Sequence, residues 1–279
     1  MITNQTTPNG FKYIEIENKS CIAKVALQGG HLFHYQRYDE KPLLWLSQKS
    51  FFEPAKAIRG GIPICWPWFG KHPSDSSLPQ HGFARTSLFE LLEVKEPDEH
   101  TTEILLQLLS TPESLTLWPY QFKVALRIII GPKLTVALTT INCDTGSFSI
   151  SSALHSYFAV SDIHNVSVQG LHAKRYWDAL TGEHKIQQGD VHIREEVDRV
   201  YQGTLNPLTL HDDDRTIHIH AKGSSSTVVW NPWIDKALQM ADMENNAHKT
   251  MLCIETANAR DDTKNLASGE EHTLQVVLS

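Results

Sequence analysis

The chain has 279 residues, of which 41% are hydrophobic and 20% are charged, as is ordinary for a soluble globular protein. Its 25 lysines and arginines face 32 aspartates and glutamates, so the net charge is −7. Because no basic run stands out, nucleic acid and an anionic membrane surface are disfavoured as partners. The length allows one domain over residues 1–279 with a substantial core.

The cysteines and the N-terminus indicate a reducing compartment. Cys21, Cys65, Cys143 and Cys253 lie far apart, and none is paired with another Cys or His at zinc spacing. The first ten residues are polar and lack the apolar core of a signal peptide. No apolar run approaches the ~20 residues of a membrane span. We therefore expect a cytoplasmic protein with free thiols.

Short alternating segments open the chain. Alternation of apolar and polar residues predicts strands at 13–17 and 21–27, and a further strand at 32–38 follows two glycines. Residues 51–58 are predicted to hold one helical turn that leads into a loop beginning at Arg59.

The middle of the chain predicts longer strands, at 88–94, 103–109, 122–130 and 133–143. In the last of these, Leu134, Val136 and Leu138 are expected on one face of the sheet. The apolar stretch 147–160 predicts one more long strand, which contains His155.

The second half of the chain also consists mainly of short segments that are typical of strands. Strands are predicted at 166–168, 175–177, 216–221, 226–230, 251–256 and 274–278. One helix is expected, with Asn231 as N-cap, Pro232 in the first position and a body over 233–243. Since no repeat or linker interrupts this series, the sequence predicts a single all-β domain, a large antiparallel β-sandwich with few short helices.

The loop from Arg59 to Arg85 combines glycines, prolines and aromatic residues. Its Trp and Phe rings require burial or a ligand face. The arginine at each end is a planar cation suited to phosphate or carboxylate, and Gln80 and His81 add polar groups beside the second arginine. A packed turn with two surface arginines is the alternative. We hypothesise a pocket for an anionic sugar.

Two ionisable residues on distant strands are candidates for acid/base chemistry. His155 lies in an apolar, aromatic strand, where a hydrogen-bonded core histidine is the common alternative. Glu255 lies near the end of a strand that reads as internal, and a buried carboxylate is costly unless it is paired or functional. Asp198, in a charged turn, is a surface acid unless the ligand has hydroxyls to fix. His155 and Glu255 together supply the minimum for general acid/base catalysis.

Other sequence patterns give little information about function. His218 and His220 share one face of a strand, but a solvated face is the expected reading because no further metal ligand is in sight. The sequence holds no glycine-rich phosphate loop and no dinucleotide fingerprint. A reaction without a metal or an organic cofactor is therefore predicted.

Seven segments together resemble the glucose-6-phosphate 1-epimerases, also called hexose-6-phosphate mutarotases, of the aldose 1-epimerase superfamily. The resemblance spans nearly the whole chain, in order. It implies an antiparallel β-sandwich of the galactose-mutarotase type and no cofactor. The segments are 59–63, 66–70, 80–85, 154–158, 197–201, 229–233 and 253–255.

The resemblance also implies roles for individual residues. The family's catalytic histidine and glutamate fall on His155 and Glu255. Its phosphate and sugar contacts fall on Arg59, Gln80, Arg85 and Asp198. A histidine near His81 is catalytic or sugar-binding in mutarotases of free sugars, but the local motif differs, so we expect only a substrate contact there.

The implied reaction is the interconversion of α and β anomers of hexose 6-phosphates, glucose 6-phosphate foremost. Two alternatives remain: a mutarotase of free aldoses, and a non-catalytic carbohydrate-binding protein on the same fold. The two arginines argue against the first, and the presence of both His155 and Glu255 argues against the second. We expect a monomer whose partner is a small-molecule sugar phosphate, with no nucleic acid and no membrane.

Overall fold

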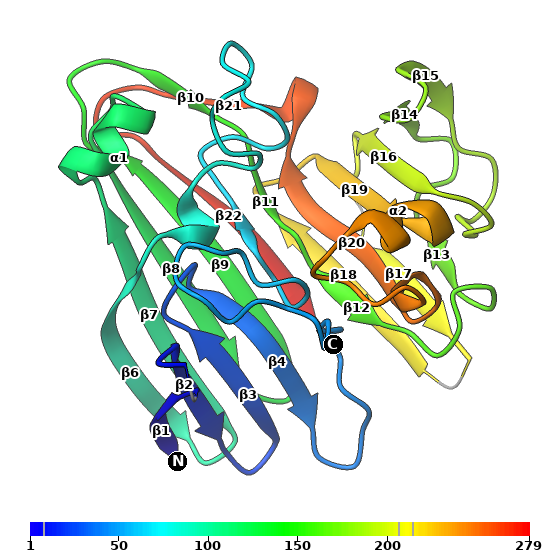
Figure 1. Ribbon diagram of the computed structural model, residues 1–279, viewed down its shortest axis with the longest axis horizontal. Coiled ribbons are helices and arrows are strands. Elements are labelled where there is room, and N and C mark those ends of the chain that lie inside the picture. Colours follow the sequence, from blue (N-terminus) through cyan, green and yellow to red (C-terminus); the bar gives the residue numbers. More distant parts are fainter. Residues whose placement is uncertain (8, 206, 214) are drawn as a thin grey trace.

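The computed structural model describes residues 1–7, 9–205, 207–213 and 215–279. These residues form two eight-stranded sheets, one four-stranded sheet and one two-stranded sheet, and every strand pairing in them is antiparallel (Figure 1). The predicted all-β sandwich with few short helices is confirmed.

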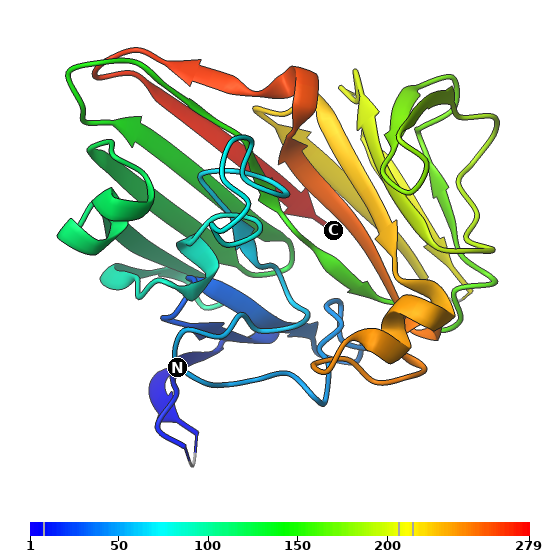
Figure 2. The same cartoon turned by 45° about the horizontal axis from the view of Figure 1, so that its top comes forward.

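The N-terminal sheet has four strands in chain order. They are β1 (Ile2–Thr6), β2 (Lys12–Glu17), β3 (Cys21–Ala26) and β4 (His31–Arg37). The first strand was not predicted, because its sequence is polar and none of its residues is fully buried. In Figures 1 and 2 this blue sheet lies beside β6, β7 and β8, and its apolar face joins the main core.

One eight-stranded sheet follows the order β13-β17-β18-β22-β9-β8-β7-β6. Its alternation matches the sequence prediction, since Leu134, Val136 and Leu138 are all buried on one face. The strands are β6 (Glu90–Asp98), β7 (Thr101–Leu109), β8 (Phe122–Ile130), β9 (Leu134–Asn142), β13 (Ser167–Gln169), β17 (Leu208–Asp212), β18 (Arg215–Lys222) and β22 (Glu271–Leu278).

The other eight-stranded sheet follows the order β15-β14-β16-β19-β20-β11-β5, and β12 also pairs with β20. We call it the site sheet. Its strands are β5 (Ile64–Cys65), β11 (Ser152–Leu154), β12 (Tyr157–Ala159), β14 (Arg175–Asp178), β15 (Glu183–Ile186), β16 (Val197–Gln202), β19 (Ser226–Asn231) and β20 (Met251–Asn258). The two-stranded sheet joins β10 (Phe148–Ile150) to β21 (Lys264–Leu266).

Every residue of β20 is buried, so both faces of this strand are covered. On one face, Ile254 and Thr256 line a cavity of about 10 Å³ together with Ile219 and Ala221 of β18, so the two large sheets pack face to face there. Because side chains alternate along a strand, Cys253, Glu255 and Ala257 point to the opposite face. That outer face carries the candidate site.

Two apolar clusters cover the outer face of the site sheet. One includes Trp45, Tyr157 and Trp230 together with Ala237 of α2. The other includes Cys65, Val200 and Val228. Both contain a neighbour of Glu255 in β20, namely Cys253 and Ala257, so Glu255 lies between the two clusters.

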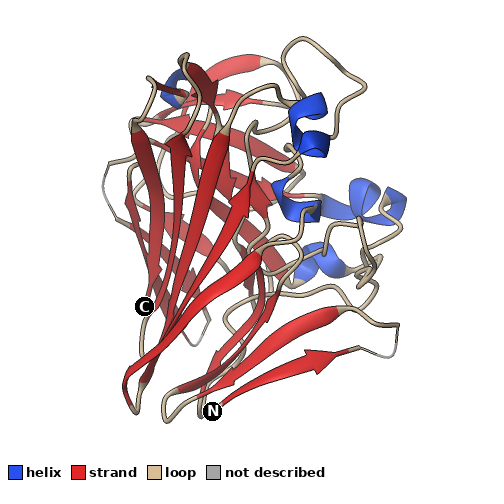
Figure 3. Cartoon of the chain, turned by 90° about the vertical axis from the view of Figure 1, so that its left-hand side faces the viewer, coloured by secondary structure: helices blue, strands red, loops and turns tan. Residues whose placement is uncertain are grey.

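The helices are short. They are α1 (Pro112–Leu117), α2 (Trp233–Gln239) and the 3-10 turns η1 (Ala84–Thr86), η2 (Ala247–Lys249) and η3 (Arg260–Asp262); Figure 3 shows them as blue coils on the red sheets. Of the helices formed by the described residues, none is long and apolar enough to cross a membrane.

Three predicted elements differ from the structure. The stretch 51–58 forms turns rather than a helical turn, and Ala55 there has a φ of 62°, which a right-handed helix cannot accommodate. The predicted helix 233–243 ends at Gln239, because Met240 takes an extended conformation with a ψ of 113°. Asn231 is the last residue of β19, although its side chain does accept a hydrogen bond from the Trp233 backbone N–H (2.9 Å).

The predicted long strand 147–160 is divided into β10, β11 and β12. The second division leaves His155 and Ser156 outside the ladder, between two short strands that both pair with β20. His155 therefore lies at a break in the sheet, not within a continuous strand. This break frees the residue to turn toward the outer face.

Candidate active site

Glu255 lies in the middle of β20, not near the strand's end as the sequence suggested. It is opposite Val228 of β19, which is opposite Val200 of β16. Asp198 is two residues from Val200 on β16, so it points to the same face. Asp198 thus belongs to a strand and not to the charged turn that the sequence predicted. The register brings both acids to one surface.

His155 is placed beside Glu255 by the strands on either side of it. Leu154 pairs with Thr256 and Tyr157 pairs with Cys253, so the intervening residues run alongside Glu255. The Nδ1 atom of His155 lies 3.3 Å from the Oε1 atom of Glu255. The exposed fractions of His155 and Glu255 are 7% and 2%. Two residues that are 100 positions apart therefore meet inside the protein.

Polar atoms of this pair are left without hydrogen bonds. In the described part of the chain, neither Nδ1 of His155 nor Oε2 of Glu255 has a hydrogen-bond partner. A buried unsatisfied polar atom costs about 1–3 kcal/mol, so such atoms call for an explanation. Hydrogen bonding of these two atoms to a polar ligand would explain why neither has a partner within the chain.

Aromatic rings surround the imidazole of His155. Tyr157 stacks on it with ring centroids 4.7 Å apart and an interplanar angle of 7°. Trp230 and His81 meet it edge-on at 6.0 Å and 5.9 Å. These contacts exclude water and restrict the orientation of the ring.

The surroundings move the two pKa values in opposite directions. Burial, together with His81 and the cations of Arg59 and Arg85, lowers the pKa of His155 well below 6.5. Burial and the charge of Asp198 raise the pKa of Glu255 well above 4.5, against the opposing effect of Arg85. Both shifts favour the uncharged forms, a neutral imidazole and a protonated carboxyl, over an ion pair, with one proton between the two groups.

Gln80, His81 and Arg85 lie at one rim of this surface. The guanidinium of Arg85 donates a hydrogen bond to the backbone oxygen of Gln80 (2.8 Å). Nδ1 of His81 accepts a hydrogen bond from the Gly70 N–H (3.2 Å). Burial and the two arginines, Arg85 and then Arg59, lower the pKa of His81 to about 3, so its ring is neutral.

Gly82 sets the path of this rim. Its φ is 72°, and a Cβ atom added there would lie 2.0 Å from the Trp66 backbone oxygen. Only glycine fits such a close approach. The two tryptophans of the loop are used for packing and not as a ligand face, since the exposed fractions of Trp66 and Trp68 are 0% and 5%.

Arg59 approaches the site from the other end of the loop. Its Nη1 atom donates to the hydroxyl of Tyr157 (2.9 Å), and its Nε atom donates to Oδ2 of Asp242 (3.1 Å). Neither partner was singled out from the sequence. Tyr157 could have been noted because it follows His155 at the spacing of one strand face, whereas nothing in the sequence around Asp242 distinguishes it.

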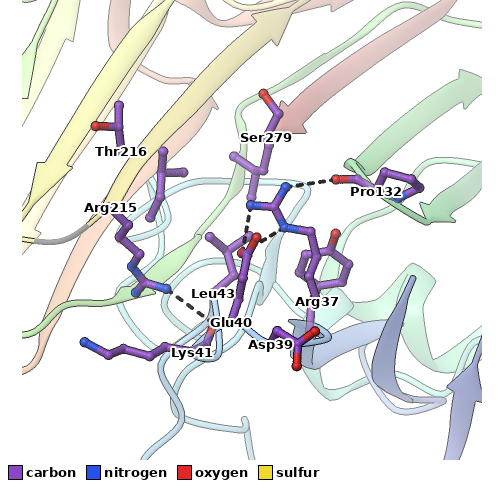
Figure 4. A pocket seen from close by; sticks show the side chains of 12 residues that line it. Arg37, Asp39, Glu40, Lys41, Leu43, Pro132, Arg215, Thr216 and Ser279 are labelled. Atoms are coloured by element: carbon purple, nitrogen blue, oxygen red, sulfur yellow. Dashed lines mark hydrogen bonds and ion pairs between the residues drawn. The ribbon is translucent and has the colours of Figure 1, made fainter. Parts of the chain in front are cut away.

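Two larger hollows are not lined by this pair, although Glu255 does contribute to the lining of the cavity of about 10 Å³ between the two large sheets. A cavity of about 350 Å³ lies between the end of β4 and β18, and the predicted site residues are absent from its lining (Figure 4). Its arginines hold the wall together: Arg37 pairs with Glu40, and Arg215 donates to the backbone oxygen of Pro42. Asp198 lines a different hollow of about 520 Å³, beside Trp233.

Two further histidines were considered as metal ligands in the sequence, His218 and His220. His218 and His220 are exposed on β18, as predicted for a solvated face. Among the described residues, no group of three or more His, Cys, Asp or Glu side chains could hold a metal ion.

A protein-family comparison assigns the chain to a known group of enzymes. The family model described as aldose 1-epimerase matches residues 12–279. The chain belongs to the aldose 1-epimerase family. Members of this family are isomerases that act on sugars, so the predicted enzyme class and small-molecule sugar substrate are confirmed at that level.

Relatives of this aldose 1-epimerase extend over nearly its whole length. A protein from Cenchrus ciliaris is 36% identical over 98% of this chain and 86% of its own. A protein from Escherichia coli is 32% identical over 95% of this chain and 89% of its own. Both carry the name "putative glucose-6-phosphate 1-epimerase".

Solved structures agree with the family assignment. A crystal structure from Salmonella typhimurium, whose title reads "putative mutarotase", superposes with a TM-score of 0.93 at 31% identity and covers 99% of this chain and 92% of its own. A galactose mutarotase-like protein from Clostridium acetobutylicum has a TM-score of 0.78 at 15% identity, over 100% of this chain and 98% of its own, which shows the shared fold alone. The predicted galactose-mutarotase type of fold is confirmed.

Proposed function

We propose that this aldose 1-epimerase interconverts the α and β anomers of hexose 6-phosphates, with glucose 6-phosphate as the main substrate. The proposal rests mainly on the distance of 3.3 Å between Nδ1 of His155 and Oε1 of Glu255. The positive charges of Arg59 and Arg85 act electrostatically on this pair. The names of the relatives support the same substrate.

The reaction requires one proton to leave O1 and one to reach the ring oxygen. Glu255 as a carboxylate takes the O1 proton, and His155 as an imidazolium gives its proton to O5, which opens the ring to the aldehyde. Rotation about C1–C2 then presents the other face of the carbonyl. The same two groups reverse their transfers on closure, so no proton is gained or lost.

The direction of the two pKa shifts fits a single shared proton. In the empty site the proton favours Glu255. A bound sugar donates hydroxyl hydrogen bonds to the carboxylate and a ring oxygen accepts one from the imidazolium, and both favour moving the proton to His155. The pair after ring opening has the proton arrangement of the empty enzyme. Before the ring opens, one proton therefore passes from Glu255 to His155, and the two transfers with the sugar then follow.

Binding of the phosphate is assigned to the arginines. In a protein of net charge −7, a dianionic sugar phosphate gains nothing from the overall field, so the attraction is local. Arg59 and Arg85 bind the phosphate in this proposal. Gln80, His81 and Asp198 contact sugar hydroxyls, and Asp198 has a raised pKa chiefly because it is partly buried. Neither a metal nor an organic cofactor takes part.

Saturation-transfer NMR on the anomers of glucose 6-phosphate, with and without protein, tests this function. We expect rapid exchange between the anomer signals with protein, and slower exchange on free glucose under the same conditions. Faster exchange on free glucose would favour the mutarotase of free aldoses. Binding without any exchange would identify a carbohydrate-binding protein instead.

A further inference from the structure

We infer that Tyr157 and Asp242 are positioning residues that hold the Arg59 guanidinium in place, and that Tyr157 at the same time fixes the ring of His155. The inference rests on the proposed function, because it takes Arg59 as a phosphate ligand and His155 as a proton donor. It connects the phosphate end of the site with the proton-transfer end.

The ring of Tyr157 is enclosed by other rings. Its exposed fraction is 1%. It stacks on His155 at 4.7 Å, stacks on Trp45 at 5.9 Å with an interplanar angle of 22°, and meets Trp230 edge-on at 6.0 Å. A side chain packed this closely keeps one rotamer, so its hydroxyl has one position.

That hydroxyl accepts the hydrogen bond from Nη1 of Arg59 (2.9 Å). The backbone of Tyr157 is fixed by two further hydrogen bonds. Its N–H donates to the Gly61 oxygen (2.9 Å), and its own oxygen accepts from the Trp45 N–H (2.9 Å). Burial raises the pKa of Tyr157 above 10, so the hydroxyl stays neutral beside the cation. Displacement of Tyr157 would therefore disturb both Arg59 and His155.

Asp242 holds the opposite edge of the guanidinium. Its Oδ2 atom accepts a hydrogen bond from Nε (3.1 Å) and lies 3.1 Å from Nη2. An arginine side chain has five N–H hydrogens. The contacts with Asp242 and Tyr157 leave a hydrogen on each terminal nitrogen, which matches two oxygens of a phosphate.

A cation held this way meets the phosphate without first losing rotamer freedom, which improves binding. Removing the hydroxyl of Tyr157 should therefore weaken phosphate binding. Removing its ring should also release His155 and slow proton transfer. A purely structural tyrosine would change stability but neither of these quantities.

The test compares three variants. Tyr157→Phe removes only the hydroxyl, and Asp242→Ala removes the second anchor. Tyr35→Phe is the matched control, because Tyr35 is equally buried (3% exposed) and its hydroxyl donates to the Gly131 oxygen (2.6 Å) in the main core. Calorimetry with inorganic phosphate and anomer-exchange kinetics on glucose 6-phosphate and glucose are measured for each.

For Tyr157→Phe and for Asp242→Ala we expect the Kd of inorganic phosphate and the KM of glucose 6-phosphate to rise about 10-fold, the cost of a lost hydrogen bond to a charged group. Exchange on free glucose and kcat should stay within about 2-fold, because the His155 ring keeps its neighbours. Tyr35→Phe should lower the unfolding midpoint and leave all binding constants unchanged. Tyr157→Leu, if folded by circular dichroism, should also lower kcat on both sugars.

An unchanged Kd of inorganic phosphate in Tyr157→Phe overturns the role of the hydroxyl. A lower KM in Asp242→Ala shows that the Asp242 carboxylate competes with the phosphate for Arg59 and does not position it. If wild type exchanges glucose 6-phosphate anomers while Tyr157→Phe is unaffected, the inference fails and the proposed function stands. If wild type binds phosphate without exchange and Tyr157→Phe loses that binding, the proposed function fails and the positioning role stands. A wild type that neither binds inorganic phosphate nor exchanges the anomers overturns both.

Discussion

At the scale of single residues, the proposed chemistry depends on one histidine and one glutamate that share a proton. We expect His155→Ala and Glu255→Gln each to reduce anomer exchange by ~10²–10⁴-fold, the usual contribution of a general acid or base. Both variants should keep the fold, because His155→Ala removes a ring nitrogen that lacks a hydrogen-bond partner and Glu255→Gln keeps the size and shape of the side chain. NMR exchange rates and circular dichroism measure the two effects.

His218→Ala is the control for the substitution itself, since this histidine is exposed on β18. It should exchange anomers like wild type. Near wild-type exchange in either His155→Ala or Glu255→Gln would remove that residue from the mechanism.

The pH dependence of exchange follows from the same pair. Activity should be level while the pair holds one proton. At the acid end it falls when His155 and Glu255 are both protonated, and because the pKa of His155 is lowered this occurs below 6.5. At the alkaline end it falls when the last proton leaves, well above 4.5 because the pKa of Glu255 is raised. A rate profile that rises steadily across this window would contradict a single shared proton.

The two arginines should affect phosphorylated sugars selectively. Arg59→Ala or Arg85→Ala should raise KM for glucose 6-phosphate by an amount equivalent to about 1.5–3 kcal/mol, the range for hydrogen bonds to charged groups. Exchange on free glucose should change less, because in this proposal a sugar without a phosphate makes no contact with either guanidinium. Kinetics on both sugars decide the matter: equal losses on the two would show that these arginines are structural.

At the scale of elements, the rim that carries Gln80, His81 and Arg85 depends on Gly82. Gly82→Ala should destabilise the protein and raise KM, because the new Cβ atom would lie 2.0 Å from the Trp66 oxygen and the rim must shift. Gly182→Ala is the matched control, since Gly182 has the same φ of 72° but no atom within 4 Å of the added Cβ.

The control should show only the cost of the left-handed conformation, roughly 1–2 kcal/mol. Urea unfolding gives the free energies, and sugar-phosphate kinetics give KM. Equal destabilisation of the two variants with unchanged KM would mean that the rim does not need this close approach.

At the scale of the whole molecule, buried neutral histidines should make the fold acid-sensitive. His31 is 1% exposed, its Nε2 contacts the Gly60 oxygen at 2.7 Å, and burial lowers its pKa to about 4. In the unfolded chain its pKa is near 6.5, so between these values the unfolded state binds the extra proton. Stability is therefore full above about 6.5 and falls with decreasing pH, by up to roughly 1.4 kcal/mol per pH unit for this group.

His31→Gln keeps a donor for the Gly60 oxygen but cannot titrate. Its free energy of unfolding, measured in urea from pH 7 to pH 4.5, should decrease less steeply than that of wild type. Parallel curves for the two proteins would show that His31 does not contribute to the acid sensitivity.

Regular strands could be read from the sequence because their information is local. The predicted strand 122–130 coincides with β8 and the predicted 133–143 with β9, since alternation and the Gly131-Pro132 turn define them without help from the rest of the chain. The helix α1 was missed because it has six residues and none of them is buried, so its sequence contains no apolar helical face that would predict it. The single-domain organisation and the monomeric state stay predictions.

The sequence by itself determined the all-β class, the antiparallel sandwich and the residue types of the candidate site, because periodicity and motif chemistry are properties of short segments. Only the tertiary structure decided that 147–160 breaks beside β20, that Asp198 lies on the same sheet face as Glu255, and that Arg59 is held by Tyr157 and Asp242. Those facts depend on strand register and on contacts between segments as far apart as 183 positions. Local patterns do not contain such pairings, because they form only when the sheets pack.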